Sequence, residues 1–441
     1  MRARFTTMLL LLLMVTATAD DKAESLNTLM TRYQELGQFN GVALVAESGK
    51  TLLRRGYGFS DHQDGRANEP GARFLIGSIS KSFTAKLVFQ FADEGKLDLS
   101  KTIADYLPYY RRDTGSQITL KQLLNHTDGL SNYTNNPEFW LPYDDGVPMS
   151  TQEFVQTYCS SELQFAPGSE YRYGNAGYTI LGAIIEELSG KSFASVLETR
   201  ILAPLRMQNS GDSRVGLPNE RLALGYQIGP DGYRLAEPIH KPFIAAASIY
   251  ATVDDLLTYI ESIDHEALTS RVFEGAVNGP FAYGWTVSDY RPHETADSVR
   301  VLSTNGEVNG YNALLIRTIE SQQTVILLNN TGETDLLSMA ANVLQILNGK
   351  SAQQPTPRTR DGFYAALKEQ GVDAAIRFYR MHHDDDPSDY IYFRWPLRIL
   401  ATQLISDGRN KDAIKILRLN LETHPDDTQS AQMLSAQAGC D

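Results

Sequence analysis

A serine and a lysine stand three positions apart in Ser78-Ile79-Ser80-Lys81, at the start of a long apolar stretch. Side chains three positions apart are neighbours on one face of an α-helix. A lysine held away from water there is disfavoured as a cation and can act as a base, which makes the serine beside it a candidate nucleophile. Two common residue types at one spacing also recur by chance, so the pattern needs support from the rest of the chain.

The helix predicted from Ile79 to Glu94 is apolar around most of its circumference, which is typical of a buried helix. Lys81 falls among its small residues, next to Ser78 in projection. The alternative is a lysine that reaches from the first turn into solvent. The backbone N–H of Ser78 lies at the helix start, where such donors have no helical partner, and it can face a developing oxyanion.

A second candidate site lies in the loop from Phe165 to Tyr178, just before a helix predicted to run to about Leu188. Tyr173 and Asn175 are two positions apart, so in extended backbone both side chains can point to the same side. A phenol can shuttle a proton if a nearby ammonium lowers its pKa, and an amide can hold a substrate carbonyl. The alternative is a structural loop whose aromatic residues only pack.

Composition sets limits on the class of protein. The chain has 441 residues, of which 42% are hydrophobic, and its formal net charge is -13. No run of basic residues occurs, which argues against a nucleic-acid-binding protein. The sequence shows no metal-ligand spacing, and we expect neither a metal nor an organic cofactor. The acidic run that begins at His382 is interpreted as a solvated loop rather than a metal site. The two cysteines, Cys159 and Cys440, either form one bridge or are unrelated thiols.

The N-terminus is typical of an export signal. Basic residues precede a short apolar run from Met8 to Val15, and small residues around Ala17 and Ala19 fit a cleavage site. We therefore expect residues 1–19 to be removed and the protein to be periplasmic or secreted. An uncleaved N-terminal anchor is the alternative. No other apolar stretch is long enough to cross a bilayer.

Strand patterns at both ends of residues 25–349 enclose a mostly helical middle. A β-hairpin is predicted from Gly41 to Gly58. Four later strands are predicted at Phe281 to Ser288, Val299 to Thr304, Tyr311 to Arg317 and Thr324 to Leu328, followed by a helix at about Asp335 to Leu347. The pattern favours an α+β fold, with one antiparallel sheet built from both ends, flanking helices and a helical subdomain.

A Pro-rich linker at residues 350–360 separates this domain from a segment at 361–441 that is predicted to be all-helical. The run from Gly408 to Leu417, closed by Asn420 to Asp426, resembles one tetratricopeptide repeat ending in its proline. So short a stack cannot bury its own apolar face, and we expect it to pack on the main domain.

Residues 30–349 resemble the penicillin-recognising serine hydrolases, in the branch of class C β-lactamases, D-alanyl-peptide carboxypeptidases, D-aminopeptidases and related esterases. Four segments carry the resemblance in the same order along the chain: Phe74 to Leu87, Leu123 to Leu130, Pro167 to Gly182 and Ala203 to Met207. The resemblance implies that Ser78 is the acylated nucleophile, that Lys81 is its proton partner and that Tyr173 is the general base or relay. It also implies that Asn175 contacts substrate and lysine, and that His126 is structural.

The third motif of the family departs from its pattern here. The family has a Lys or His, a small residue and a glycine on a strand at the edge of the cleft, and the basic position falls on Thr304. Gly306 and Gly310 fit the family's glycines, and the backbone N–H of Glu307 is implied as the second oxyanion donor. Because the missing cation helps to hold a substrate carboxylate, Thr304 disfavours penicillins and D-Ala-terminated peptides.

The prediction is an exported serine hydrolase that acts through an acyl-enzyme on an ester or amide. A β-lactamase or D-Ala-D-Ala carboxypeptidase is the alternative within the enzyme class. The alternative outside it is a catalytically decayed scaffold that binds a protein partner through its C-terminal helices. Specificity is expected to reside in loops such as Asn132 to Ser150, whose aromatic residues either line a cleft or belong to the core.

Overall fold

The computed structural model describes residues 18–136, 139, 149–217, 220–229, 232–236, 243–275, 279–290, 298–332, 334–382 and 394–438. The predicted export signal lies outside these residues except for its last two positions. Trp140, Tyr143 and Cys440 lie outside them as well, and so does the whole acidic run after His382. Within the described part of the chain, no helix combines the length and apolar character needed to cross a membrane.

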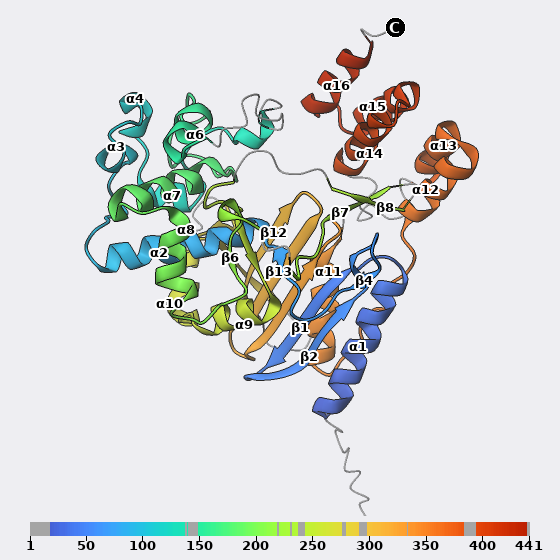
Figure 1. Cartoon of the computed structure of the whole chain (residues 1–441), viewed down its shortest axis with the longest axis horizontal. Coiled ribbons are helices and arrows are strands. Elements are labelled where there is room, and N and C mark those ends of the chain that lie inside the picture. Colours follow the sequence, from blue (N-terminus) through green and yellow to red (C-terminus); the bar gives the residue numbers. More distant parts are fainter. Residues whose placement is uncertain are drawn as a thin grey trace, which may run out of the picture.

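One seven-stranded antiparallel sheet forms the centre of the molecule (Figure 1). Its spatial order is β10-β11-β12-β13-β14-β1-β2, so strands from the two ends of the domain meet where β14 pairs with β1. The bounds are β1 Gly41–Glu47, β2 Lys50–Tyr57, β10 Phe281–Ala282, β11 Trp285–Tyr290, β12 Val299–Val308, β13 Tyr311–Thr318 and β14 Gln323–Asn329. The α+β fold predicted from the sequence is confirmed.

The predicted strand from Phe281 to Ser288 is wrong as one element, because it is broken into β10 and β11 at Tyr283-Gly284. Gly284 has a φ of 84°, which favours glycine. A Cβ there would lie 2.5 Å from the Cα of Ser82, so the break lets the chain pass close to the start of helix α2 (Ser80–Asp93). The interruption is a two-residue hairpin turn, since β10 pairs antiparallel with β11 and both turn residues have positive φ.

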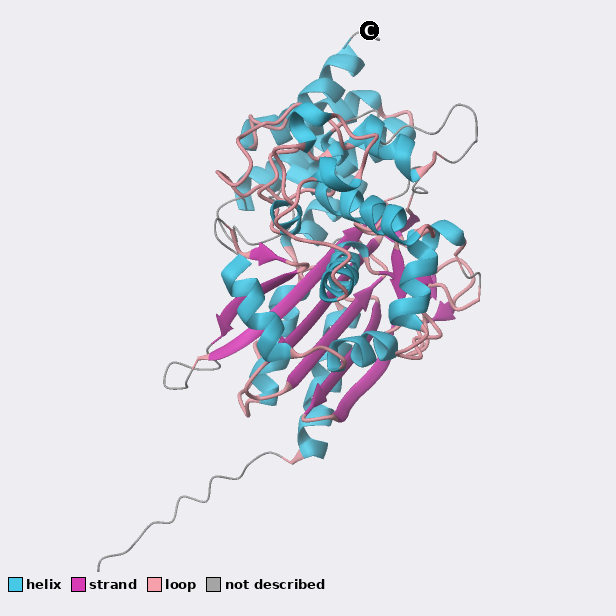
Figure 2. Ribbon diagram, turned by 90° about the vertical axis from the view of Figure 1, so that its left-hand side faces the viewer, coloured by secondary structure: helices cyan, strands magenta, loops and turns pink. Residues whose placement is uncertain are grey.

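Both faces of the sheet are covered by helices (Figure 2). Strand β1 explains why, since Val42 and Leu44 belong to the core on one face and Ala43 and Val45 to the core on the other. A strand with apolar residues on both sides must be buried on both sides. Helices α1 (Ala19–Glu35) and α11 (Leu336–Leu347) cover one face. Helix α2 and α9 (Val253–Glu261) lie in the core of the other face.

A helical subdomain extends from α2 on the side of the larger core (Figure 1). Its helices are α3 Ile103–Tyr106, α4 Arg112–Gly115, α5 Leu120–Leu124, α6 Thr151–Tyr158, α7 Ala176–Ser189 and α8 Phe193–Leu197, with the single turns η2 Tyr133–Asn135 and η4 Glu198–Leu202. Helix α10 His265–Gly275 follows α9. The small strands are β3 Phe59–Asp61, β4 Arg66–Ala67, β5 Phe74–Leu75, β6 Gly211–Asp212, β7 Tyr226–Gly229, β8 Gly232–Leu235 and β9 Ile249–Ala251, with the turn η5 at Ser213–Val215.

The C-terminal region is helical and has a hydrophobic core of its own. Its helices are α12 Thr359–Gln370, α13 Val372–His382, α14 Arg394–Ser406, α15 Asn410–Thr423 and α16 Thr428–Ala438. The β7–β8 hairpin lies between these helices and the sheet domain (Figure 1). Ile228 of that hairpin packs against the C-terminal core, so the two parts of the chain share an apolar contact.

Candidate active site

Ser78 lies in a short 3-10 turn, η1 (Gly77–Ile79), that leads directly into helix α2. Strand β5 fixes the entry to this turn by pairing with β9. Gly77 has a φ of 52°, and a Cβ on it would lie 2.6 Å from the backbone nitrogen of Glu307. Only glycine allows this backbone to approach β12 so closely. Ser78 is half-buried, so its hydroxyl is reachable from outside the core.

Lys81 is fully buried at the first turn of α2, with 0% of its surface exposed. Its Nζ lies 2.9 Å from Ser78 Oγ, 2.7 Å from Asn175 Oδ1 and 3.1 Å from the carbonyl oxygen of Ala246. Among the described residues, no carboxylate forms an ion pair with it. Burial lowers the pKa of Lys81 to about 7. The expected burial of this lysine is observed, and the snorkelling alternative does not apply.

The three partners of Lys81 can satisfy either protonation state, since an ammonium donates to all three oxygens and a neutral amine donates to two of them. A neutral amine has two N–H donors and one lone pair. The oxygens of Asn175 and Ala246 can only accept, so they take the two donors. The lone pair then faces Ser78 Oγ at 2.9 Å and can accept the proton of its hydroxyl. Removal of the Ser78 proton by Lys81 needs no rearrangement of side chains.

Tyr173 and Asn175 lie beside this pair, as predicted. The Tyr173 ring is 5.0 Å from Lys81 Nζ, and 37% of the residue is exposed, so it lines the open side of the site. Burial of the hydroxyl end raises the pKa of Tyr173, although a hydrogen bond with Ser78 opposes that shift. The predicted shuttle role of Tyr173 depends on a pKa lowered by a nearby ammonium. The pKa of Tyr173 is raised instead. Tyr173 is therefore a neutral phenol, suited to relaying a proton.

His126 supports the loop that carries Tyr173. Its Nδ1 accepts a hydrogen bond from the backbone N–H of Gly174 at 3.3 Å, and its carbonyl accepts one from Arg172 at 2.9 Å. The imidazole ring lies 4.4 Å from the Tyr173 ring. Burial and the nearby Lys81 hold the pKa of His126 well below its usual range, so the ring stays neutral. Its contacts fit the structural role that the resemblance implied.

Gly306 brings strand β12 against the nucleophile turn. A Cβ on Gly306 would collide with the carbonyl oxygen of Ile76 and lie 2.7 Å from the backbone nitrogen of Ser78. A Cβ on Gly77 would in turn lie 2.6 Å from the backbone nitrogen of Glu307. The backbone nitrogens of Ser78 and Glu307 therefore lie at the same close contact between β12 and η1. An oxyanion hole uses two backbone donors that lie close together. The role of Gly77 was not found from the sequence, although its place directly before the candidate nucleophile was a signal.

Thr304 occupies the β12 position at which the family resemblance implies a Lys or His. It is 2% exposed, and its Oγ1 has no hydrogen-bond partner among the described residues. Leu302 and Val308, which share its strand face, belong to the same core as α2, so Thr304 faces that core. This edge of the site therefore offers a neutral hydroxyl.

Two further groups near the site were not found from the sequence. The carbonyl of Ala246 contacts Lys81 from 165 positions away, and a backbone atom leaves no sequence signal. Asp128 is buried, and its Oδ1 accepts a hydrogen bond from the N–H of Leu130 at 2.8 Å. Burial raises the pKa of Asp128 to about 7.

The aromatic loop after Asn132 contributes to the core where it is described. Tyr133 and Phe139 are buried at 3% and 1% exposure, and both rings contact Phe154. Cys159 is a buried thiol nearby. No group of three or more potential metal ligands occurs among the described residues.

The chain matches a protein family and several curated relatives. The Beta-lactamase family matches residues 26–348. The teichoic acid D-alanine hydrolase of Staphylococcus aureus (strain MRSA252) is 28% identical over 280 residues, which cover 63% of this chain and 66% of that relative. Penicillin-binding protein 4* of Bacillus subtilis (strain 168) is 25% identical over 338 residues, which cover 71% of this chain and 73% of that relative.

A solved structure shares the fold. The D-amino acid amidase from Ochrobactrum anthropi SV3, complexed with D-phenylalanine, superposes with a TM-score of 0.61 at 20% identity. The superposition covers 75% of this chain and 99% of the amidase. The family match spans well over half of the 441 residues and contains every candidate residue named above. The chain therefore belongs to the β-lactamase family and is a serine hydrolase of that family.

Proposed function

We propose that this protein is an exported hydrolase that cleaves an ester or amide through an acyl-enzyme on Ser78. The observation that carries the proposal is the buried Lys81, whose Nζ lies 2.9 Å from Ser78 Oγ and whose pKa is about 7. A base with a pKa near neutrality is half-deprotonated at physiological pH and is well matched to accept the serine proton.

The proposed reaction begins when Ser78 Oγ attacks the carbonyl carbon and its proton passes to Lys81 Nζ. The carbonyl oxygen becomes an oxyanion that the N–H groups of Ser78 and Glu307 stabilise. The proton then passes to the leaving oxygen or nitrogen, with Tyr173 as relay, and an acyl-enzyme ester remains on Ser78. Water attacks this ester and gives a proton to Lys81, the bond between the acyl carbon and Ser78 Oγ breaks, and Lys81 returns the proton to Oγ as the acid product leaves. Asn175 orients Lys81 through the 2.7 Å contact between Oδ1 and Nζ.

The substrate class is proposed from the absence of a cation at Thr304. A substrate carboxylate at this edge would meet a neutral hydroxyl, so a neutral or cationic acyl donor fits better. The name of the Staphylococcus relative concerns removal of D-alanine from teichoic acid, which supports an aminoacyl donor without a free carboxylate. Hydrolysis of β-lactams or of D-Ala-D-Ala peptides stays the alternative, and the Bacillus relative carries the name of a penicillin-binding protein.

Export is proposed from the basic and apolar pattern of residues 1–19. The decayed-scaffold alternative is not favoured, because the four candidate side chains retain mutual contacts suited to catalysis. Residues 361–441 are proposed to form a tetratricopeptide-like extension.

The test is hydrolysis and labelling of wild type and Ser78→Ala. A labelled penicillin, a chromogenic cephalosporin, short-chain aryl esters, D-alanyl esters and D-Ala-D-Ala peptides form the panel. We expect turnover of esters or amides and covalent labelling by an acylating probe, both lost in Ser78→Ala. The matched control is Ser82→Ala on the same helix, whose hydroxyl donates to the Ile79 carbonyl at 2.8 Å. Turnover that survives in Ser78→Ala overturns the proposal.

A further inference from the structure

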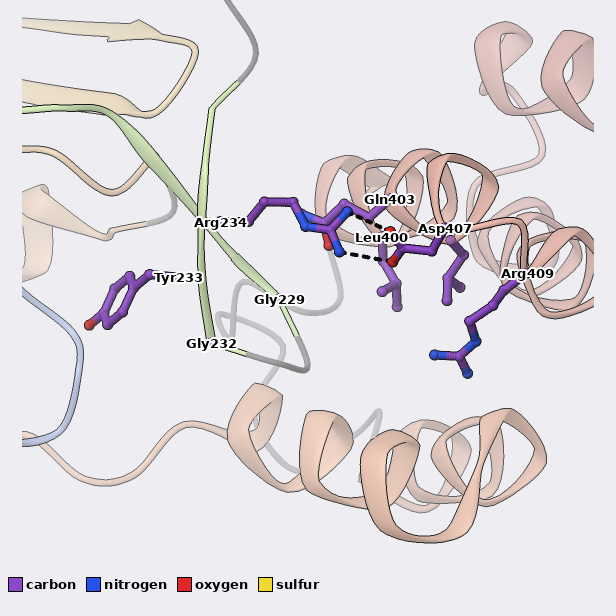
Figure 3. Close-up of a pocket in the computed structure, with 9 residues that line it drawn as sticks. Gly229, Gly232, Tyr233, Arg234, Leu400, Gln403, Asp407 and Arg409 are labelled. Atoms are coloured by element: carbon purple, nitrogen blue, oxygen red, sulfur yellow. Dashed lines mark hydrogen bonds and ion pairs between the residues drawn. The ribbon is translucent and has the colours of Figure 1, made fainter. Parts of the chain in front are cut away.

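The β7–β8 hairpin connects the C-terminal helices to the sheet domain through side chains as well as apolar contact. Gln403 of α14 donates a hydrogen bond from Nε2 to Gln227 Oε1 of β7 at 3.3 Å. Arg234 of β8 forms a two-pronged ion pair with Asp407, the residue directly after α14, at 3.0 and 2.8 Å. Figure 3 shows Gln403 and Asp407 turned toward the hairpin, across a cavity of about 150 Å³. Gln403 is 6% exposed, so its amide is part of a buried contact.

The same Gln227 reaches the turn between β12 and β13. Its Nε2 donates to Asn309 Oδ1 at 3.0 Å. Gln227 therefore accepts from α14 with one atom of its amide and donates to the turn with the other. Gly310, the next residue of the turn, has a φ of 80°, and a Cβ there would lie 2.8 Å from the Cα of Gly225. The segment before β7 thus presses on the turn while Gln227 bonds to it.

This turn lies close to the proposed oxyanion donor. Glu307 is on β12, and Asn309 follows it by two residues, just after the strand ends. Two residues of a strand span about 7 Å. The nitrogen of Glu307 faces Gly77 at the contact between β12 and η1. Oxyanion stabilisation depends on donor positions to within a fraction of an ångström, because hydrogen-bond energy falls steeply with distance and angle. Small shifts of the turn therefore change catalysis.

We propose that α14 positions the oxyanion donor of Glu307 through the chain Gln403–Gln227–Asn309. These three amides are positioning residues that act through the β12–β13 turn. The C-terminal helices are then part of the catalytic machinery of the sheet domain. The inference rests on the proposed function, since it assigns no chemistry to the three amides themselves.

The test compares wild type with Gln403→Ala, Gln227→Ala, Asn309→Ala and the pair Gln403→Ala with Gln227→Ala. Kinetics use the ester or amide that wild type hydrolyses fastest, with phenylboronic acid as a probe that forms a tetrahedral adduct at a nucleophilic serine. We expect kcat to fall about 10-fold in each single variant with KM little changed, since misplacement by an ångström can lower rates up to about 100-fold. Boronate affinity falls in parallel with kcat. The kcat of the double variant should fall no further than that of Gln227→Ala alone, because both substitutions interrupt the same chain of contacts.

The matched control is Arg234→Ala, which breaks the neighbouring ion pair at the same interface and leaves the three amides in place. It should keep the wild-type kcat and boronate affinity. Circular dichroism and urea unfolding check that each variant folds, and Asn309→Ala repeats the test without altering the surface of α14. If Gln227→Ala and Asn309→Ala keep the wild-type kcat while Ser78 is still labelled by the acylating probe, the inference is overturned and the proposed function stands. An equal loss in Arg234→Ala also overturns it, since the effect then follows docking alone. If Ser78→Ala retains turnover, the proposed function fails first, and this inference fails with it.

Discussion

The two walls of the candidate site differ in the kind of group that they contribute. The helical wall, formed by α2 and the loops around α5 and α7, holds buried titratable side chains at Lys81, His126 and Asp128. The strand wall, formed by β12, holds a backbone glycine at Gly306 and the neutral Thr304. The pKa values of the three titratable groups are all moved by burial.

The difference indicates a division of labour in the proposed reaction. Proton transfer depends on burial and is concentrated on the helical wall, where Lys81 has two fixed acceptors and faces Ser78. The strand wall supplies fixed dipoles, which depend on the position of the backbone and not on titration. Changes on the helical wall should therefore alter pH dependence, and changes on the strand wall should alter rates or stability without shifting the pH profile.

The largest expected effect is that of Lys81→Met, which keeps the length of the side chain and removes the base. We expect kcat/KM to fall by about 10³ to 10⁴, the upper part of the range for loss of a general base. In wild type, kcat/KM should rise with pH through about 7, because Lys81 must be deprotonated to act. The residual activity of Lys81→Met should lack that rise.

Lys86→Met is the matched control for this change. Lys86 lies on the same helix, and its Nζ contacts Ser262 Oγ at 3.2 Å, away from Ser78. It should retain the wild-type rate and pH profile. A Lys81→Met protein with near-wild-type turnover would show that another group takes the serine proton.

The next largest effect is expected on the strand wall, from Gly306→Ala. The new Cβ would meet backbone on both sides, at the Ile76 oxygen and the Ser78 nitrogen, so β12 and η1 must separate. We expect kcat to fall about 100-fold, comparable to loss of one oxyanion donor. The pH profile of the remaining activity should keep the inflection near 7.

Ser303→Ala on the same strand is the control, since it removes a hydroxyl from β12 without adding an atom between β12 and η1. Steady-state kinetics between pH 5 and 9 distinguish the two walls. A shifted inflection in Gly306→Ala would contradict the division, because it would mean that the strand wall also sets the pKa of the base.

The sequence anticipated the local parts of this site better than the distant ones. Ser78 and Lys81 are joined by helix geometry, which their spacing alone predicts. The first strand of the hairpin was likewise predicted from a continuous apolar run. The Ala246 carbonyl is brought to Lys81 by the packing of a distant segment, and no side chain there signals the contact. The turn at Tyr283-Gly284 separates β10 from β11, and the apolar pattern of the run does not mark it, although Gly284 was a local signal.

A smaller effect is expected from Asp128→Asn on the helical wall. The pKa of Asp128 is about 7 in the folded protein, against an ordinary value of 3.8, so the folded state holds its proton over that interval while the unfolded state releases it. Wild-type stability is therefore lost as pH rises from about 4 to 7. The amide introduced by Asp128→Asn cannot ionise, and its oxygen can still accept from the N–H of Leu130. We therefore expect the free energy of unfolding of this variant to exceed that of wild type by about 2 to 4 kcal/mol at pH 8.

Urea unfolding at pH 5, 6.5 and 8 checks this prediction. The advantage of Asp128→Asn should shrink toward pH 5, and kcat at pH 8 should change little. Asp113→Asn is the control, because that carboxyl is exposed and pairs with Arg111 on the surface. A stability difference that is the same at all three pH values would mean that Asp128 does not titrate in this range.

The smallest effect is expected from Thr304→Val, which replaces a buried hydroxyl that has no partner in the described structure by a methyl group of similar size. A buried polar group without a hydrogen bond destabilises the fold, so the free energy of unfolding should rise by about 1 kcal/mol. If the strand wall acts through its backbone, kcat and KM should both stay at wild-type values. A raised KM with unchanged kcat would instead assign the hydroxyl to substrate binding, because loss of a contact made equally in the ground and transition states weakens binding alone. The strand wall would then select substrates through Thr304 as well as through the N–H of Glu307.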